Sequence, residues 1–341
     1  MPGGWFLAET FVSCNLYRVS KDLQYSIPEK RGIIPRFSGI DTFFNVAKLL
    51  KRGIGLNIVI HRKRKPTFVL VVPRFEDIFH SFYAIEVIRG VSLSASRLNA
   101  DFLIHITDRG DHRGWLDSTL MDPTYIDGIL FADIDNDVDV VKKALRRGVP
   151  CLVLNNILEE PINYVAVDNK KAAFEVIEYL IGTGHKKIAT IAGDVSTQAG
   201  LMRLEGYREA LHEHDLAAPR QYVTFGEFLR TPARTAALKL LKLDDRPTAI
   251  FAASDVMALE VIDAAKSLNI RVPGDLSVIG FDDNPLCANS SIELTTVTQP
   301  ISEMGRLGAE NLSLISQGKA RLPMKITLPT RLIKRKSVER I

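Results

Sequence analysis

From residue 67 onward the chain alternates short apolar runs with longer amphipathic stretches. The apolar runs, many of them rich in β-branched residues, predict strands at 68–72, 102–106, 128–131, 151–154, 188–192, 249–252 and 276–281. The amphipathic stretches predict helices at 82–98, 138–147, 169–183, 198–213, 231–241, 255–268 and 301–317. Because strands that are apolar throughout lie in sheets covered on both faces, this order predicts an α/β protein with parallel, doubly wound sheets.

The strands fall into two series, which predicts two similar lobes with a ligand-binding cleft between them. We expect the first lobe at about 67–163 and 296–322, and the second at about 164–295 and 323–333. A short basic tail, 334–341, follows. In open parallel sheets a ligand binds beyond the carboxyl ends of the strands, so side chains that follow those ends are the first candidates for a site.

Residues 1–66 differ from this regular body. They hold twelve Lys and Arg against four Asp and Glu, a balance near +8, although the whole chain carries only +4 at pH 7. One amphipathic stretch, 42–51, predicts a helix, and the basic run 61–65 before Pro66 is expected to be a linker. The charge asymmetry favours a basic module that meets a polyanion, while a basic surface without a partner would have the same composition.

Other protein classes find little support in the sequence. Three cysteines, Cys14, Cys151 and Cys287, are too few and too scattered for a disulfide framework or a metal cluster. No phosphate-binding loop, dinucleotide fingerprint or nucleophile elbow occurs, so we expect no cofactor, no metal and no enzymatic activity. No run approaches the roughly 20 apolar residues of a membrane span. The apolar start lacks a basic segment and contains Glu9, so we expect a cytoplasmic protein without a signal peptide.

Five motifs then occur in order along the body. They are GTGHKKI at 182–188, RLEGYR at 203–208, PTAIFAASDVMALE at 247–260, VPGDLSVIGFDD at 272–283 and LTTVTQPISEMGR at 294–306. Together they resemble the effector domain of the lactose/galactose-repressor family, over about four-fifths of the chain. The resemblance implies a periplasmic-binding-protein-like fold of type I, a sugar-like effector, operator DNA as a partner and a homodimer.

The N-terminal region departs from that family. The segment NVAKLL at 45–50 resembles the first helix of the family's helix-turn-helix, but the recognition-helix pattern is not present at 53–60. We therefore expect a divergent, partly helical region with a degenerate helix-turn-helix at 41–60. The candidates for DNA phosphate contacts are Lys48, Lys51, Arg52, Arg62, Lys63 and Arg64. A solvated basic linker is the alternative, and no base-reading residue is predicted.

Two residues are the leading candidates for effector binding. The guanidinium of Arg203 can donate paired hydrogen bonds to vicinal hydroxyls or a carboxylate, and the resemblance assigns it to the effector. A surface salt bridge with Glu205 or Glu209 is the alternative. Asp282 follows a strand end, and by resemblance it accepts hydrogen bonds from effector hydroxyls.

Five further residues are weaker candidates for the same site. Asp255 follows a strand and could instead, with Ser254, cap the next helix, and Asn155 aligns by resemblance with a polar ligand contact. Phe228, Phe82 and Tyr83 could stack on a sugar or purine ring, although most aromatics in such a body lie in the core.

These features lead to two functional hypotheses. In the first, the protein is a transcriptional regulator, most simply a repressor, whose lobes close on an effector and so change the affinity of a dimer for DNA. In the second, it is a sugar-sensing binding protein that has lost DNA binding. Whether residues 41–65 fold into a DNA-binding unit distinguishes the two hypotheses.

Overall fold

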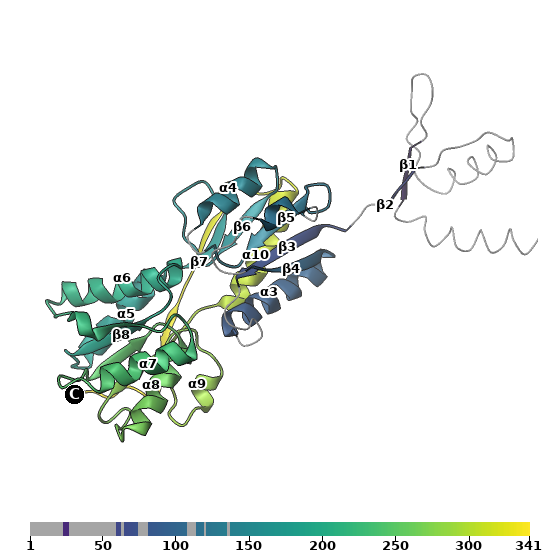
Figure 1. Ribbon diagram of the computed structural model, residues 1–341. Helices are drawn as coiled ribbons and strands as arrows, with labels where there is room; N and C mark the ends of the chain where they lie inside the picture. Colours follow the sequence, from purple (N-terminus) through teal and green to yellow (C-terminus); the bar gives the residue numbers. More distant parts are fainter. Residues whose placement is uncertain are drawn as a thin grey trace, which may run out of the picture. The chain divides into compact units, whose positions relative to one another are not determined.

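The computed structural model describes residues 23–26, 59–62, 65–73, 81–107, 114–118, 121–134 and 137–341. The chain separates into two units, Met1–Lys65 and Pro66–Ile341 (Figure 1). The helix expected at 42–51 lies outside the described residues. The same is true of five predicted DNA contacts: Lys48, Lys51, Arg52, Lys63 and Arg64.

The smaller unit contains a strand pair that the sequence did not predict. Strand β1 (Leu23–Ser26) pairs antiparallel with β2 (Val59–Arg62). Strand β2 takes in the end of the predicted helix-turn-helix and the start of the predicted linker, and Arg62 is its last residue. The β-branched residues Val59 and Ile60 favour an extended backbone, which explains a strand where a linker was expected.

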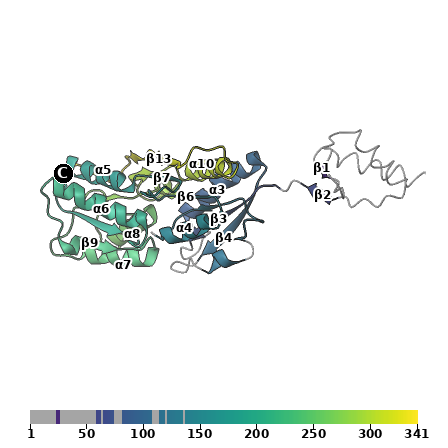
Figure 2. The same ribbon diagram turned by 90° about the horizontal axis from the view of Figure 1, so that it is seen from above.

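The first lobe of the larger unit is built on a six-stranded, all-parallel sheet in the order β13-β7-β6-β5-β3-β4. Its strands are β3 (Thr67–Pro73), β4 (Asp101–Thr107), β5 (Gly128–Phe131), β6 (Cys151–Leu154), β7 (Tyr164–Val167) and β13 (Lys325–Leu328). Helices α3 (Phe82–Leu98) and α10 (Ile301–Ser316) lie side by side on one face of this sheet (Figures 1 and 2). Helix α4 (Val138–Arg146) and the 3₁₀ turn η1 (Trp115–Asp117) cover the other face.

Strand β3 shows why these strands are apolar at every position. Phe68, Leu70 and Val72 pack against the core beneath α3 and α10. Val69 and Val71 point to the opposite face and pack in the core beneath α4. Successive side chains of a strand alternate between faces, so a sheet covered by helices on both sides needs apolar residues throughout.

The second lobe repeats the plan on a four-stranded parallel sheet in the order β11-β10-β8-β9. Its strands are β8 (Ile188–Ala192), β9 (Val223–Phe225), β10 (Ala249–Ala252) and β11 (Ser277–Ile279). Helices α5 (Asn169–Gly182) and α6 (Gln198–Glu213) pack on one face, and α7 (Arg230–Leu241) and α8 (Asp255–Ser267) on the other. The remaining elements are η3 (Arg220–Tyr222), α9 (Leu286–Asn289), and the antiparallel pair β12 (Thr296–Thr298) and β14 (Arg331–Ile333).

The predicted architecture of two α/β lobes with parallel sheets is confirmed, but the lobe boundaries differ from those expected. Strands β7 and β13, assigned in advance to the second lobe, pair with each other in the sheet of the first lobe. Strand β12, assigned to the first lobe, is flanked by bridges from Thr295 to Ile279 and from Thr298 to Asp282 in the second lobe. These strands have only three or four residues, too few for a clear periodic signal, and their sheet is decided by the neighbour with which they pair.

The chain passes between the two lobes three times, after β7, before α10 and after β13. Three short connections of this kind allow one lobe to rotate relative to the other without unfolding either sheet. Within the described residues, no helix is both long enough and apolar enough to cross a lipid bilayer.

Candidate ligand site between the lobes

Side chains from both lobes come together beyond the carboxyl ends of their strands. Tyr83 at the start of α3 and Asp133 after β5 belong to the first lobe, while Arg203 in α6 and Asp282 after β11 belong to the second. The charges of Asp133, Arg203 and Asp282 all act on the pKa of the Tyr83 phenol, which burial raises well above its usual value. We call this group of residues, with those described below, the interlobe site.

The guanidinium of Arg203 is the best-fixed group of the site. Its Nε donates to Asn169 Oδ1 at 2.9 Å, its Nη1 donates to the carbonyl of Ala253 at 2.6 Å, and the side chain is 4% exposed. Its Cζ atom lies 3.6 Å from the centre of the Phe281 ring, a stacking cation–π contact. No protein acceptor among the described residues lies within hydrogen-bonding distance of Nη2, so this end of the guanidinium can still serve a ligand.

The alternative prediction for Arg203, a surface salt bridge, is wrong. Glu205 pairs with Arg208 at 3.0 Å, and Glu209 pairs with Lys170 at 2.9 Å. Among the described residues, the only carboxylate within 4.0 Å of the Arg203 guanidinium is that of Asp282, 3.8 Å from Nη1.

Helix α6 brings Arg203 to this position through two local features of its sequence. Thr197 caps the helix, since its hydroxyl accepts from the backbone N–H of Gly200 at 3.1 Å. Gly206 lets α6 approach α5 closely, because a Cβ there would lie 2.2 Å from the carbonyl oxygen of Lys170. The glycine of the RLEGYR motif therefore supports the placement of its arginine.

Asp282, whose side chain is 15% exposed, lies beside Arg203 on a strained turn. Its backbone φ is +122°, and its N–H donates to the carbonyl of Val297 at 2.8 Å, which holds the turn in place. Its Oδ1 accepts from Gln299 Nε2 at 2.6 Å. Burial raises the pKa of Asp282 to about 7, Arg203 works against this rise, and Asp255 adds to it. The carboxyl group is therefore poised to change its protonation near neutral pH.

Asp255 has its two carboxylate oxygens occupied by protein donors. Oδ1 accepts from the Thr296 hydroxyl at 2.5 Å and Oδ2 from the Asn284 N–H at 2.7 Å, and the residue is fully buried. Of the two cap candidates it is Ser254 that caps the helix, since its hydroxyl accepts from the N–H of Met257 at 3.4 Å. Asp255 thus holds the loop that carries Asp282 and does not cap the helix, while its contact with a ligand stays a prediction.

Two buried acceptors near the candidate site, among the described residues, have no donor. Asn155 Oδ1, at the carboxyl end of β6, and Gln299 Oε1, between β12 and α10, make no hydrogen bond among the described residues. The residues are 4% and 5% exposed. A buried acceptor left unpaired costs about 1–3 kcal/mol, so these two oxygens mark where a ligand would donate hydrogen bonds.

The predicted aromatic contacts divide into two groups. The ring of Phe228 lies 5.8 Å from Arg203 Cζ, and it occupies the space over Gly193, where a Cβ would be 2.1 Å from the ring. The hydroxyl of Tyr83 donates a hydrogen bond to the carbonyl of Ala132 in the same lobe. Phe82 packs against the apolar core of the first lobe. Tyr83 packs against the same core and Phe228 against a core of the second lobe, but Phe228 and Tyr83 also lie near Arg203, whereas no such contact links Phe82 to the site among the described residues.

Three residues of the site were missed by the sequence reasoning. Asp133 follows β5, and the strand-end rule that found Asn155 could have found it. Phe281 and Gln299 lie inside two of the five motifs, but nothing in their spacing shows that one stacks beneath Arg203 and the other touches Asp282. Within the described part of the chain, no three His, Cys, Asp or Glu side chains are grouped so that they could hold a metal ion.

Comparisons with known proteins agree with this geometry. Residues 177–338 match a periplasmic binding protein-like domain. The chain is 32% identical over 281 residues to the HTH-type transcriptional regulator DegA of Bacillus subtilis (strain 168), covering 81% of each chain. It is 34% identical over 261 residues to the HTH-type transcriptional repressor CytR of Escherichia coli (strain K12), covering 75% of this chain and 74% of that one.

Solved structures show the same fold. A complex of the transcriptional regulator CelR with cellobiose superposes with a TM-score of 0.74 at 28% identity, covering 88% of this chain and 91% of that one. A lac repressor dimer bound to operator and the anti-inducer ONPF has a TM-score of 0.73 at 23% identity, covering 86% and 98% of the two chains, and supports the fold alone. From the identity and coverage of its relatives, the chain belongs to the lactose-repressor (LacI) family of transcriptional regulators, as its five motifs predicted.

Proposed function

We propose that the protein is a repressor whose affinity for operator DNA depends on a small sugar-like effector bound at the interlobe site. The observation that carries this proposal is the Arg203–Asp282 pair beyond the strand ends of the second lobe, in which Nη2 of Arg203 keeps no protein acceptor among the described residues. A ligand that bonds Tyr83 or Asn155 in one lobe and Arg203 in the other would stabilise one relative position of the lobes. Such a differential interaction is what an allosteric effector requires.

The polar groups of the site favour an effector that donates hydrogen bonds. The candidate residues combine one guanidinium, Arg203, with the carboxyl groups of Asp282 and Asp133 and the unpaired oxygens of Asn155 and Gln299. A phosphate or carboxylate would bring a further negative charge beside buried acids. We therefore propose a neutral, polyhydroxylated effector, with Phe228 and Tyr83 as the aromatic surfaces for its ring.

We also infer that the protein acts as a homodimer, joined in part along strand β4. This outer strand of the first-lobe sheet exposes large apolar side chains on both of its faces: Leu103, Ile104 and Ile106. An unpaired apolar edge is a surface that pairs with another chain. A dimer would hold two N-terminal regions at the fixed separation that a two-fold operator needs.

The basic segment 1–66 would supply the DNA contacts. Lys48, Lys51, Arg52 and the run Arg62–Arg64 are the proposed phosphate contacts, which give affinity and salt dependence but no choice of sequence. Acting on genomic DNA places the protein in the cytoplasm, and this role requires no catalytic step.

The test is binding of the full-length protein to fluorescent genomic fragments, including its own upstream region, across a salt series. We expect saturable, sequence-selective binding near 0.15 M salt, and a change in affinity when a neutral sugar that binds the protein is added. Calorimetry against neutral sugars, sugar phosphates and uronates tests the effector class separately. A phosphate or uronate that binds more tightly than every neutral sugar would contradict the proposed effector class.

Absence of selective DNA binding, together with tight sugar binding, would instead support the second candidate. In that case the protein is a sugar-sensing module whose DNA-binding part has been lost. The strand β2 in place of the end of a helix-turn-helix is the observation that favours this candidate.

A further inference from the structure

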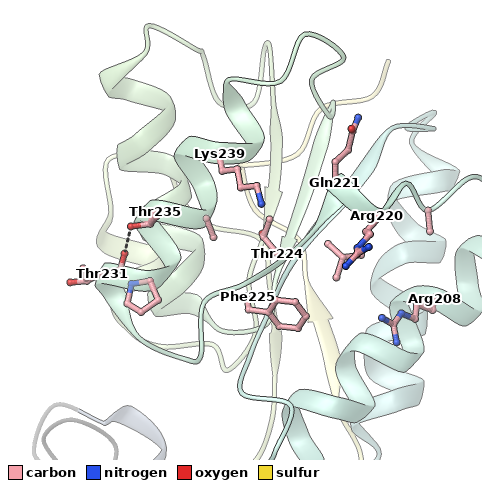
Figure 3. A pocket seen from close by; sticks show the side chains of 12 residues that line it. Arg208, Arg220, Gln221, Thr224, Phe225, Thr231, Thr235 and Lys239 are labelled. Carbon is pink, nitrogen blue, oxygen red and sulfur yellow. Dashed lines mark hydrogen bonds between the residues drawn. The ribbon is translucent and has the colours of Figure 1, made fainter.

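The second lobe carries a groove that is separate from the interlobe site. The groove has a volume of about 1250 Å³ and runs along β9, the outer strand of the four-stranded sheet (Figure 3). Its walls come from α6 and η3 on one side of the strand and from α7 on the other. Pockets for small molecules occupy about 300–1,000 Å³, so the volume of this groove exceeds that usual for a single small ligand.

The charged side chains of the groove are all cationic. Lys239 reaches in from α7, and Arg220 and Arg208 come from the opposite side of β9 (Figure 3). No acidic residue lines the groove. Among the described residues, no carboxylate lies within 4.0 Å of the charged groups of Arg220 or Lys239, while the partner of the half-exposed Arg208 is Glu205. The groove thus presents positive charge on both of its walls.

The floor of the groove is an open sheet edge. Gly226 donates its N–H to the carbonyl of Ala192 in β8, so the backbone groups of Phe225, one residue earlier, point away from β8. The Phe225 side chain is 49% exposed beside this edge. A residue of another extended chain could exchange both backbone hydrogen bonds with Phe225.

We propose that this groove binds an acidic, extended segment of a partner protein, which adds to β9 as a fifth strand. Successive side chains of an added strand point to opposite faces, so neighbouring acidic residues would reach Lys239 on one wall and Arg208 and Arg220 on the other. Apolar side chains of the same segment would cover Phe225. A second copy of this chain would bring the same three cations into the groove, and like-charge repulsion disfavours that occupant.

The test begins with a displayed library of random twelve-residue peptides selected on the full-length protein. We expect enriched peptides rich in Asp and Glu, whose affinity falls at least about tenfold on the double variant R220E/K239E. The matched control is K186E/K242E, which makes the same charge change at exposed residues of the second lobe outside the groove and should leave affinity unchanged. The melting temperatures of both variants show whether the fold is retained.

Hydrogen exchange then tests strand addition itself. Bound peptide should slow exchange of the backbone amide of Phe225, because that N–H becomes bonded. Displacement of the peptide by inorganic pyrophosphate, with no change in this exchange, would indicate a site for small anions and overturn the proposal. A library that yields no peptide dependent on Arg220 and Lys239 overturns it as well. These measurements use neither effector nor DNA, so their outcome is independent of the proposed repressor function.

Discussion

The interlobe site and the two open sheet edges of the larger unit use the same residue types in opposite ways. In the interlobe site Arg203 is buried, stacked on Phe281 and bonded through two of its nitrogens. At the β9 edge the side chains of Arg220 and Phe225 are exposed to solvent. At the β4 edge the exposed side chains are aliphatic, as at Ile104.

This difference shows that burial, more than residue identity, determines how much a side chain contributes to the stability of the fold. A buried charge needs its partners, and removal of one leaves the other unpaired at a cost of about 3–5 kcal/mol. An exposed charge or ring at a sheet edge contributes little to the stability of the chain that carries it. The exposed residues of the two sheet edges can therefore bind partners at little cost to stability. The polar residues of the interlobe site, in contrast, also stabilise the fold.

Substitution of Arg203 should have the largest effect. Arg203→Met leaves the buried acceptors Asn169 Oδ1 and the Ala253 carbonyl without their donor, so we expect effector binding to fall below detection and the free energy of unfolding to drop by about 1–3 kcal/mol for each acceptor. Calorimetry and chemical denaturation measure the two effects. Arg208→Met, five residues along the same helix but half-exposed, is the control and should change neither by more than about 1 kcal/mol. Equal losses in both variants would remove the distinction between buried and exposed arginines.

The two sheet edges can be compared by placing the same charge on each. Ile104→Asp should raise the dissociation constant of the dimer by at least about 100-fold, because each subunit would bury a carboxylate in place of an apolar side chain. Phe225→Asp should leave the dimer intact, since β9 is proposed to bind a partner protein. Sedimentation velocity over a range of protein concentrations measures both. If Phe225→Asp dissociates the dimer and Ile104→Asp does not, the dimer contact lies along β9 and not along β4.

A smaller change tests how tightly the aromatic wall of the interlobe site is held. In Gly193→Ala the added Cβ would lie 2.1 Å from the Phe228 ring, so the ring must move, and we expect effector affinity to fall about tenfold. Gly182→Ala is the matched control, because nothing lies within 4 Å of a Cβ built at that glycine. Calorimetric titration with the identified effector gives both affinities, and an unchanged affinity in Gly193→Ala would argue against a role for Phe228.

The smallest effect concerns pH. Folding raises the pKa of Asp282 from 3.8 to about 7, so protonation favours the folded state, and this contribution to stability is lost as the pH rises through 7. An effector that donates to the carboxylate should bind several-fold more tightly at pH 8 than at pH 6, with release of protons on binding. Calorimetry in buffers of different ionisation enthalpy measures that release. Asp282→Asn should abolish the pH dependence, and its persistence in that variant would assign it to another group.

Much of the fold could be predicted because the sheets are covered on both faces. Strands such as β5 and β8 are apolar at nearly every position, and long helices such as α6 carry clear periodicity, so their bounds were predicted to the residue. Short strands such as β9, β12 and β13 carry no such signal. The strand predicted at 276–281 is limited to β11, because the chain turns at Asp282 to enter the interlobe site.

The candidate site was predicted in part. The strand-end rule and the family motifs pointed to Arg203 and Asp282, which lie 3.8 Å apart, and to Asn155, whose buried side-chain oxygen has no hydrogen-bond partner among the described residues. The same reasoning considered Asp255 as a helix cap or as a ligand contact. It could not show that the hydroxyl of Thr296, 41 residues later, donates a hydrogen bond to the Asp255 carboxylate. Gln299 was missed for the same reason, since its contact with Asp282 joins distant parts of the chain.

The sequence by itself therefore determined the α/β class, the order of the elements, the charge asymmetry of the first 66 residues and the membership of a repressor family. Periodicity and composition are local properties, and the sequence carries them directly. Only the tertiary structure decided which sheet each short strand joins, which acid Arg203 faces, which acceptors stay unpaired and which sheet edges remain open. These outcomes depend on contacts between residues far apart in the chain, where burial fixes the energy of each polar group.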